Sequence, residues 1–440
     1  MTRSDTRMAK APHPVSARGR GRVAALACVS ALAWSSAALA QEDVAPPPPP
    51  EASPWYDALS LGAFIDAYAR VNTNFPKPER ATSVLGPSAA SSGAGLSWVG
   101  LDASYAPAPV GGTLDLRFGP SAKSYAGRDA EHGLEMVKQA FAAWRPTRAL
   151  QLDFGKFDGI FGTELADSQA NFNYTRGALY WLAQPNFTTG LRARYDVTDG
   201  LDVTTLVVNG WNATVDDNTG KSFALSLGVA PTDTLSIRLG WMGGPEQPDS
   251  ATIDCAPGTA YDPGAGSCVG AAGAPGGTVT VDRGEANQFA AWRHLVDVAV
   301  RWSPTPALGL ALNADYGTQG RRDPSHGSST ITRQTWYGAS LMGRYQLSPV
   351  WGVALRGEAL HDRNDFFGTG LDQSSFVTGT LTLEAKPSDN LIIRLDARDD
   401  VQLDAPTAAD GAALGAFPKR ARDSSTSELT ATLGVVVTTN

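Results

Sequence analysis

The stretch FALSLGVA-PTD-TLSIRLGW, residues 223–241, contains two segments in which apolar and polar side chains alternate, joined by a three-residue turn. Side chains of a β-strand point alternately to opposite faces, so Phe223, Leu225 and Leu227 share one face while Ser226 lies on the other. The Pro, Thr and Asp between the segments are residues that favour tight turns. The stretch therefore predicts an amphipathic β-hairpin.

The same hairpin pattern recurs along the chain. TGLRARYDV-TDG-LDVTTLVVNGW occupies residues 189–211, LVDVAVRW-SPTP-ALGLALNADYG occupies residues 295–317, and the alternation continues to the last residues. A long series of hairpins that are apolar on one face predicts an all-β fold, a transmembrane antiparallel up-and-down β-barrel with lipid outside and water inside. A soluble all-β protein is the alternative, although soluble domains of this length usually divide.

The pattern predicts 16 strands, at residues 61–72, 95–105, 112–119, 135–144, 148–157, 188–197, 201–211, 221–230, 234–243, 291–302, 307–317, 333–347, 351–360, 374–385, 391–399 and 426–438. Seven connections are short and carry turn-forming residues: 107–110, 146–148, 198–200, 231–233, 303–306, 348–350 and 387–390. Longer connections alternate with them, as in outer-membrane barrels with short periplasmic turns and long outer loops. Fourteen strands are the alternative if 112–144 does not form a strand pair.

The first forty residues have the features of a secretory signal. A basic region with Arg18, Arg20 and Arg22 precedes an apolar run at 23–34 and an A-x-A cleavage site at 38–40. The domains expected from this are a signal peptide at 1–40, a Pro-rich periplasmic spacer at 41–58 and an outer-membrane β-barrel at 59–440.

Charge and hydropathy narrow the class of protein. The chain has 36 basic and 44 acidic residues, of which six and one lie in 1–40, so the mature chain carries a net charge of −13. An acidic chain does not favour nucleic-acid binding. No apolar run approaches the roughly 18 residues of a membrane-spanning helix. An exported chain of this kind is expected in the bacterial outer membrane.

If the apolar faces meet lipid, the opposite faces line the lumen. Those positions carry charges, arginine above all: Arg70, Arg117, Asp153, Arg192, Arg194, Arg238, Arg301, Arg344, Arg356, Glu358 and Arg394. Charges are costly in a dry core and cheap beside water, and a barrel of 16 strands is wide enough for an aqueous channel. The arginines either pair with acids of neighbouring strands and stiffen the wall, or form a constriction that favours anions.

The connection at 158–187 has little strand alternation. It carries Glu164, Asp167 and Arg176, and a long stretch without strand character in a compact protein usually has a function. We expect this loop either to fold into the lumen as a constriction, with its acids opposing wall arginines, or to pack over the mouth of the barrel.

Two cysteines, Cys255 and Cys268, follow the signal and lie in a Gly- and Pro-rich segment. In an oxidising compartment such a pair predicts a disulfide that staples a loop. The histidines form no H-E-x-x-H pattern and no G-x-S-x-G pattern is present. The sequence therefore indicates no catalytic residues, no metal site and no cofactor.

The stretch from about 60 to 246 resembles the OmpL-like β-barrel porin-2 family of Gram-negative outer membranes. The similar segments are SLGAFIDAYARVN (60–72), QAFAAWRP (139–146), LDFGKFDGIFGTE (152–164), NFNYTRG (171–177), AQP (183–185), TGLRARYDV (189–197), VVNGWN (207–212) and GPE (244–246). The resemblance implies a pore-forming outer-membrane protein without catalytic residues. We expect four residues of these segments to form a hydrogen-bonded cluster at the rim: Glu164, Asn209, Trp211 and Glu246.

Two functions follow as hypotheses. The first is a porin that lets small hydrophilic solutes diffuse passively through a charged lumen. The second is a closed barrel that serves as a structural or adhesive surface protein, whose outer loops bind a partner or a polysaccharide. The expected partners are outer-membrane lipid, small solutes and the barrel-assembly machinery, with no nucleic acid. The sequence leaves a homo-oligomer open.

Overall fold

A computed structural model describes residues 55–76, 92–106, 109–262, 267–282, 289–322, 331–368, 373–405, 415–419 and 424–439. The expected signal peptide and most of the expected spacer lie outside these ranges. A short 3-10 helix, η1 (Trp55–Ala58), precedes the first strand. From Ala58 onward the chain forms one compact unit.

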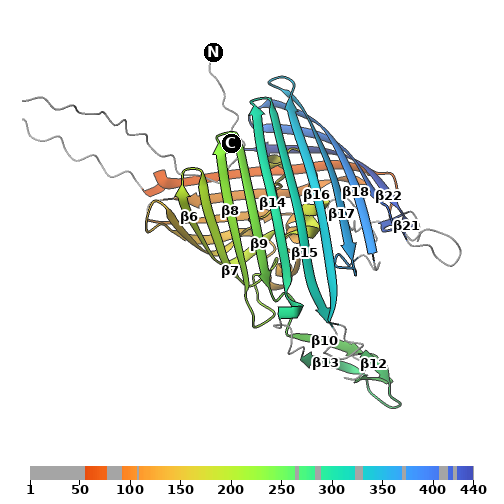
Figure 1. Ribbon diagram of the computed structural model, residues 1–440. Helices are drawn as coiled ribbons and strands as arrows, with labels where there is room; N and C mark the ends of the chain where they lie inside the picture. Colours follow the sequence, from red (N-terminus) through yellow and green to blue (C-terminus); the bar gives the residue numbers. More distant parts are fainter. Residues whose placement is uncertain are drawn as a thin grey trace, which may run out of the picture. The chain divides into compact units, whose positions relative to one another are not determined.

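Within the described residues, 16 strands close into a single antiparallel barrel (Figure 1). They are β1 (Leu59–Asn72), β2 (Gly93–Tyr105), β3 (Val110–Phe118), β4 (Val137–Trp144), β5 (Leu150–Asp158), β6 (Phe187–Thr198), β7 (Leu201–Val208), β8 (Ser222–Thr232), β9 (Leu235–Gly244), β14 (Arg293–Thr305), β15 (Leu308–Arg322), β16 (Ile331–Gln346), β17 (Trp351–Arg363), β18 (Gln373–Ser388), β19 (Leu391–Gln402) and β22 (Ser427–Thr438). Each pairs with its neighbours in chain order, and β1 pairs with β22 to close the ring.

The predicted fold class is confirmed, with 16 strands rather than 14 and with short turns alternating with long loops. The strand ends differ in detail, because β8 includes Pro231 and β18 includes Pro387, both of which were expected in turns. At both prolines the pairing register shifts, between Val229 and Thr232 and between Ala385 and Ser388. Proline cannot donate a ladder hydrogen bond, and an irregular register accommodates it.

The two faces of each strand differ as the alternation predicts. On β8, Phe223, Leu225 and Leu227 are exposed on the outer surface, whereas Ala224 and Ser226 are buried on the inner one. The outward face of the other barrel strands likewise exposes large apolar side chains, such as Leu341 and Leu355. An apolar outer band around polar inner positions is the surface that a barrel in a bilayer requires.

Helical turns occur in the long connections. They are α1 (Pro120–Ala126), η3 (Gly127–His132), η4 (Ser168–Ala170), the π-helix η5 (Leu179–Ala183) and η6 (Phe289–Ala291). In the described part of the chain, none of the helices combines the length and apolar character needed to cross a bilayer. Residues Phe417–Pro418 (β20) and Ser424–Ser425 (β21) form a small separate pairing.

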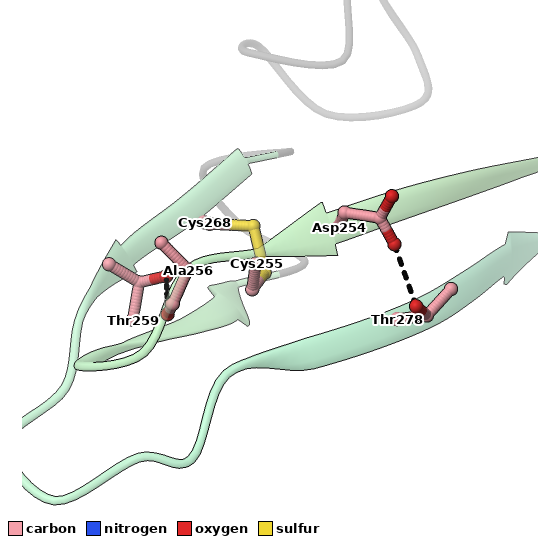
Figure 2. Close-up of a disulfide and its surroundings, with 6 residues drawn as sticks. All are labelled: Asp254, Cys255, Ala256, Thr259, Cys268 and Thr278. Atoms are coloured by element: carbon pink, nitrogen blue, oxygen red, sulfur yellow. Dashed lines mark hydrogen bonds between the residues drawn. A yellow bond between two sulfur atoms is a disulfide. The ribbon is translucent and has the colours of Figure 1, made fainter.

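The connection between β9 and β14 contains two small sheets of its own. Strand β10 (Ser250–Cys255) pairs with β13 (Gly277–Asp282), and β11 (Thr259–Asp262) pairs with β12 (Ser267–Gly270). Cys255 and Cys268 form a disulfide, with their Cα atoms 5.5 Å apart, which joins β10 to β12 (Figure 2). The hydroxyl of Thr278 donates to Asp254 across the first sheet, 2.7 Å away. We call residues 250–282 the arm.

Candidate functional site: a barrel lumen with an inward loop

The connection between β5 and β6, residues 159–186, folds into the barrel. We call it the inward loop. Of its residues only Ala170 is exposed, although the segment is rich in polar side chains. It lacks the apolar alternation that would make it a strand, so its backbone and polar side chains need partners elsewhere. Those partners come from the barrel wall, on strands from opposite sides of the ring.

The first part of the loop is held by β14 and β17. The amide of Gly162 donates to the Asp297 carboxylate over 3.2 Å, and the Arg301 guanidinium donates to the carbonyl of Thr163. Glu164 accepts a hydrogen bond from Arg356 over 2.8 Å and one from the amide of Gly177 over 2.7 Å. Glu164 thus links the wall to a later part of its own loop.

The middle of the loop is held by β1, β3 and β4. Arg117 donates to both oxygens of Asp167, over 2.9 and 2.8 Å, and Lys138 lies 3.3 Å from the same carboxylate. Two parallel bonds from one guanidinium fix the carboxylate in direction as well as in place. On β1, Asp66 accepts bonds from the hydroxyls of Ser168 and Tyr174, both over 2.6 Å.

The last part of the loop is held by the wall from β16 to β19. The amide and the hydroxyl of Thr175 both donate to Asp396 over 2.8 Å. At the start of η5, the amide of Ala178 donates to Glu358 over 3.1 Å. The indole of Trp336 donates to the carbonyl of Ala183 over 3.1 Å. Two wall arginines complete the set by donating to loop carbonyls: Arg394 to Ser168 and Arg398 to Arg176.

Electrostatics favour the docked loop. Burial alone would raise the pKa of the Asp167 carboxyl, but the neighbouring Lys138 and Arg117 outweigh it and lower the pKa to about 2. Asp167 is therefore ionised at neutral and mildly acidic pH, where its ion pairs with the wall persist. Apolar packing adds to them, since Leu179 and Ala183 lie in one buried cluster with Trp336.

A second feature of the wall is a pair of facing carboxyls. Asp297 on β14 and Asp315 on β15 are cross-strand partners within hydrogen-bonding reach, and both are almost fully buried. Asn313 donates to Asp297 over 2.7 Å.

Nearer the short turns, the inner side chains of the barrel wall are less buried. Four arginines there are partly exposed, and each contacts an acid: Arg192 with Asp153, Arg194 with Asp196, Arg238 with Asp202, and Arg344 with Glu384. The distances are 2.8, 2.9 and 3.3 Å for the first three pairs. Paired charges of both signs therefore line this part of the lumen.

Several residues expected to line the pore point inward without facing open water. Their exposed fractions are between 2% and 6%, because the inward loop or neighbouring side chains of the wall cover them: Arg70, Arg117, Asp153, Arg356, Glu358 and Arg394. Sequence patterns place a residue on the inner face, but they do not locate a loop that folds over it. Among the expected loop residues, Arg176 is also buried, with its guanidinium near the Trp181 ring.

The four residues expected to form a rim cluster do not come together as one group. Glu246 accepts bonds from the amide of Trp211 over 2.8 Å and from the hydroxyl of Ser222 over 2.6 Å. The side chain of Asn209 donates instead to the carbonyl of Thr214. Glu164 is bonded to Arg356 within the lumen. All four residues lie in segments that resemble the family, but Glu164 belongs to the inward loop and contacts Arg356 instead of the other three.

Sequence reasoning missed the residues that dock the loop from both sides. Tyr174, Ser168 and Asn173 carry most of the hydrogen bonds from the loop to β1 and β18. Lys138 and Trp336 supply the corresponding contacts from β4 and β16. The NFNYTRG segment could have indicated these docking residues, since it is polar, lacks strand alternation and is one of the segments that resemble the family. Among the described residues, no group of three or more His, Cys, Asp or Glu side chains could hold a metal ion.

Comparisons with known proteins agree with this architecture. The family profile described as "putative beta-barrel porin-2, OmpL-like" matches residues 58–438. Among solved structures, the outer membrane channel DcaP of Acinetobacter baumannii is 10% identical and has a TM-score of 0.53, with 86% of this chain and 96% of that chain covered. OmpF of Salmonella typhi, solved with daunomycin, is 12% identical with a TM-score of 0.52, and 86% and 97% of the two chains are covered.

A third structure, the anion-selective porin from Comamonas acidovorans, is 11% identical with a TM-score of 0.51, and 86% of this chain and 99% of that chain are covered. At such low identity these likenesses support the fold alone. No curated protein sequence matches the chain significantly.

Proposed function

Because the chain belongs to the OmpL-like β-barrel porin-2 family, we propose that it is a passive channel of the bacterial outer membrane for small hydrophilic solutes. The observation that carries the proposal is the inward loop, docked by hydrogen bonds on opposite sides of a charged lumen. Asp66 and Arg117 hold it on one side, and Glu358 and Asp396 hold it on the other. A barrel with only a mechanical role has no need of a loop that narrows its interior.

The proposed path runs beside the loop and past the charges near the short turns. Arg192, Arg194, Arg238 and Arg344 each have an acidic partner. Fields of paired charges largely cancel a short distance away, and salt screens what is left. We therefore expect weak ion selectivity, with solute size as the main criterion. The family and the contacts of the lumen give no reason to propose a catalytic residue.

Single-channel recording in planar bilayers tests the proposal. The refolded mature chain is expected to give ohmic steps, with a small reversal potential in a KCl gradient. A strongly anion-selective reversal potential would contradict the expected weak selectivity and would indicate that arginines control which ions pass. Absence of conductance from correctly folded, heat-modifiable protein would contradict a channel.

The role of the inward loop is tested by deletion. Removing residues 165–175 takes out Ser168, Tyr174 and Thr175, and the conductance is expected to rise because the narrowing is lost. Deletion of the arm, 250–282, is the matched control, since the arm forms sheets separate from the barrel and its loss is expected to leave the conductance unchanged. Equal conductance of wild type and the 165–175 deletion would refute the constriction.

One observation favours a second candidate, a closed barrel acting at the surface. The inward loop is almost entirely buried, and the arm carries a disulfide that joins two of its strands. A closed lumen together with a stapled arm would suit a protein whose outer loops bind a partner or polysaccharide. The recordings distinguish the two candidates, because the second predicts no conductance from wild type and measurable conductance from the 165–175 deletion.

A further inference from the structure

Two arginines inside the barrel are buried and form no ion pair with any of the described carboxylates. Arg70 on β1 is 6% exposed, and Arg176 in the inward loop is 3% exposed. The Nε of Arg70 donates to the Thr432 hydroxyl over 2.9 Å, and the Nη1 of Arg176 donates to the carbonyl of Tyr174 over 3.1 Å. A buried charge is costly unless an opposite charge accompanies it. Both arginines therefore favour an anion beside them.

A third arginine lies next to these two. The Nη1 of Arg398 on β19 donates to the carbonyl of Arg176 over 2.9 Å, and the charges of Arg398 and Arg176 both repel that of Arg70. The Nη2 of Arg398 and the Nε of Arg176 are buried, and neither has a hydrogen-bond partner in the part of the chain that the structure describes. We call Arg70, Arg176 and Arg398 the arginine cluster. Its members come from two strands and a loop, and they keep N–H donors unused.

Three acids lie near the arginine cluster, but each is already bonded to another group. Two hydroxyls of the inward loop donate to Asp66. The Nε of Arg398 donates to both oxygens of Asp400 over 2.9 Å, and a side-chain amide of β1 donates to Glu428 over 2.8 Å. These carboxylates reduce the positive field around the cluster. They leave its unused donors without an acceptor.

Aromatic rings flank the arginine cluster. The guanidinium carbon of Arg70 lies 5.0 Å from the centre of the Tyr68 ring, and that of Arg176 lies 5.8 Å from the centre of the Trp181 ring. A ring face offsets part of a cation's charge, but it does not replace an oxygen acceptor for the planar N–H donors of a guanidinium. Both rings are only partly buried. A small solute that enters from the long-loop end, where β1 and β19 finish, therefore reaches the cluster past these rings.

We propose that the arginine cluster binds the phosphate group of a small phosphorylated solute that enters the lumen. Guanidinium donors form short, charge-assisted bonds with phosphate oxygens. A carboxylate has two oxygens, whereas the phosphate of a monoester has three terminal ones, so three guanidinium groups favour phosphate. The inference rests on the proposed channel function and names a class of solute for it. The paired arginines near the short turns take no part, so weak selectivity between potassium and chloride is still expected.

Isothermal titration calorimetry of the folded full chain in detergent measures the binding, with inorganic phosphate and glycerol 3-phosphate as probes in a chloride buffer. Wild type is expected to bind each probe saturably at one site. R70Q and R176Q, tested separately, are each expected to weaken both affinities by at least about tenfold, because each removes a charge-assisted contact. R128Q is the matched control, since Arg128 lies in a long connection at the same end of the barrel and pairs with Asp217 over 2.6 Å. It is expected to bind like wild type.

Several outcomes would overturn the proposal. They are absence of saturable phosphate binding by wild type, wild-type affinity in both R70Q and R176Q, or an equal loss in R128Q. Binding of inorganic phosphate without glycerol 3-phosphate would overturn the assignment to a solute, and equal binding of succinate would overturn the assignment to phosphate. Heat-modifiability on gels confirms that each variant is folded, and R176Q carries the test if R70Q does not fold. Because no bilayer is used, a failure to conduct would refute the channel without changing the binding result.

Discussion

Asp66 illustrates what a wall carboxylate does inside this barrel. It is fully buried and accepts hydrogen bonds from two residues of the inward loop, Ser168 and Tyr174. A buried carboxylate is tolerated when donors replace water. Single polar residues of the loop therefore contribute to stability through the wall groups that they satisfy, and not through apolar burial alone.

Replacing Tyr174 with Phe tests this contribution. The change removes one of the two donors of Asp66 and keeps the ring, so a loss of about 1–3 kcal/mol in unfolding free energy is expected. The readout is the denaturant midpoint of the refolded barrel in lipid vesicles. Tyr316→Phe on the outward face is the control and is expected to change little. Equal midpoints for the two variants would contradict the role of Asp66.

Asp167 leads to a prediction about pH. The pKa of its carboxyl is lowered to about 2 in the folded protein, below the roughly 3.9 of an unfolded chain. A lowered pKa stabilises the folded state above the unfolded value, and this stabilisation is lost only as the pH falls towards 2. We therefore expect the conductance at pH 5 to equal that at pH 7, and Asp167→Asn to raise it at both. A rise for wild type between pH 7 and pH 5 would show that another group controls the loop.

At the scale of elements, the inward loop and the arm are stabilised in different ways. The loop has no sheet of its own and depends on the wall, through contacts such as Gly162 with Asp297 and Ala178 with Glu358. The arm has its own paired strands and a disulfide between Cys255 and Cys268. The loop is therefore coupled to the barrel, whereas the arm can change without it.

Loss of the disulfide tests this independence. In the variant C255S/C268S, the loop entropy that the crosslink removes is restored, which for a closure of this size is worth about 3 kcal/mol. Faster cleavage of the arm by a protease is expected, together with unchanged single-channel conductance and an unchanged denaturant midpoint of the barrel. A lower barrel midpoint would mean that the arm supports the barrel after all.

At the scale of the whole molecule, closure of the ring and the apolar outer band are the dominant features. Pairing of β1 with β22 leaves no free sheet edge in the barrel, so each barrel strand has a neighbour on both sides for its ladder hydrogen bonds in lipid. The outward leucines then contact acyl chains instead of a protein core. This explains why an exported chain without a long apolar run can still be a membrane protein.

A charge on the outer band measures how deep a position lies in lipid. Leu225→Arg, in the middle of β8, is expected to destabilise the barrel by about 2–4 kcal/mol, the cost of arginine near the bilayer midplane. Leu225→Ala is the control at the same position and is expected to cost much less. The measurement is the free energy of folding into vesicles. Equal costs for Arg and Ala would place Leu225 outside the hydrocarbon layer.

The sequence by itself determined the barrel. Alternation in stretches such as 223–241 defines which side chains face lipid, and the turns between them define the strand number, because both signals are local. The family resemblance of segments such as 171–177 pointed to the same class of protein. The disulfide was also accessible from sequence, since two cysteines thirteen residues apart in an exported loop have few other partners.

Only the tertiary structure decided how the lumen is filled. Glu164, Asp167 and Tyr174 are close to one another in sequence, yet their partners Arg356, Arg117 and Asp66 come from strands far apart in the chain. No periodicity encodes such contacts, because they depend on the curvature of the closed sheet and on the path of an irregular loop. For the same reason, arginines that the alternation correctly turns inward are covered by that loop, and the surface that meets solute is set by the folded lumen as a whole.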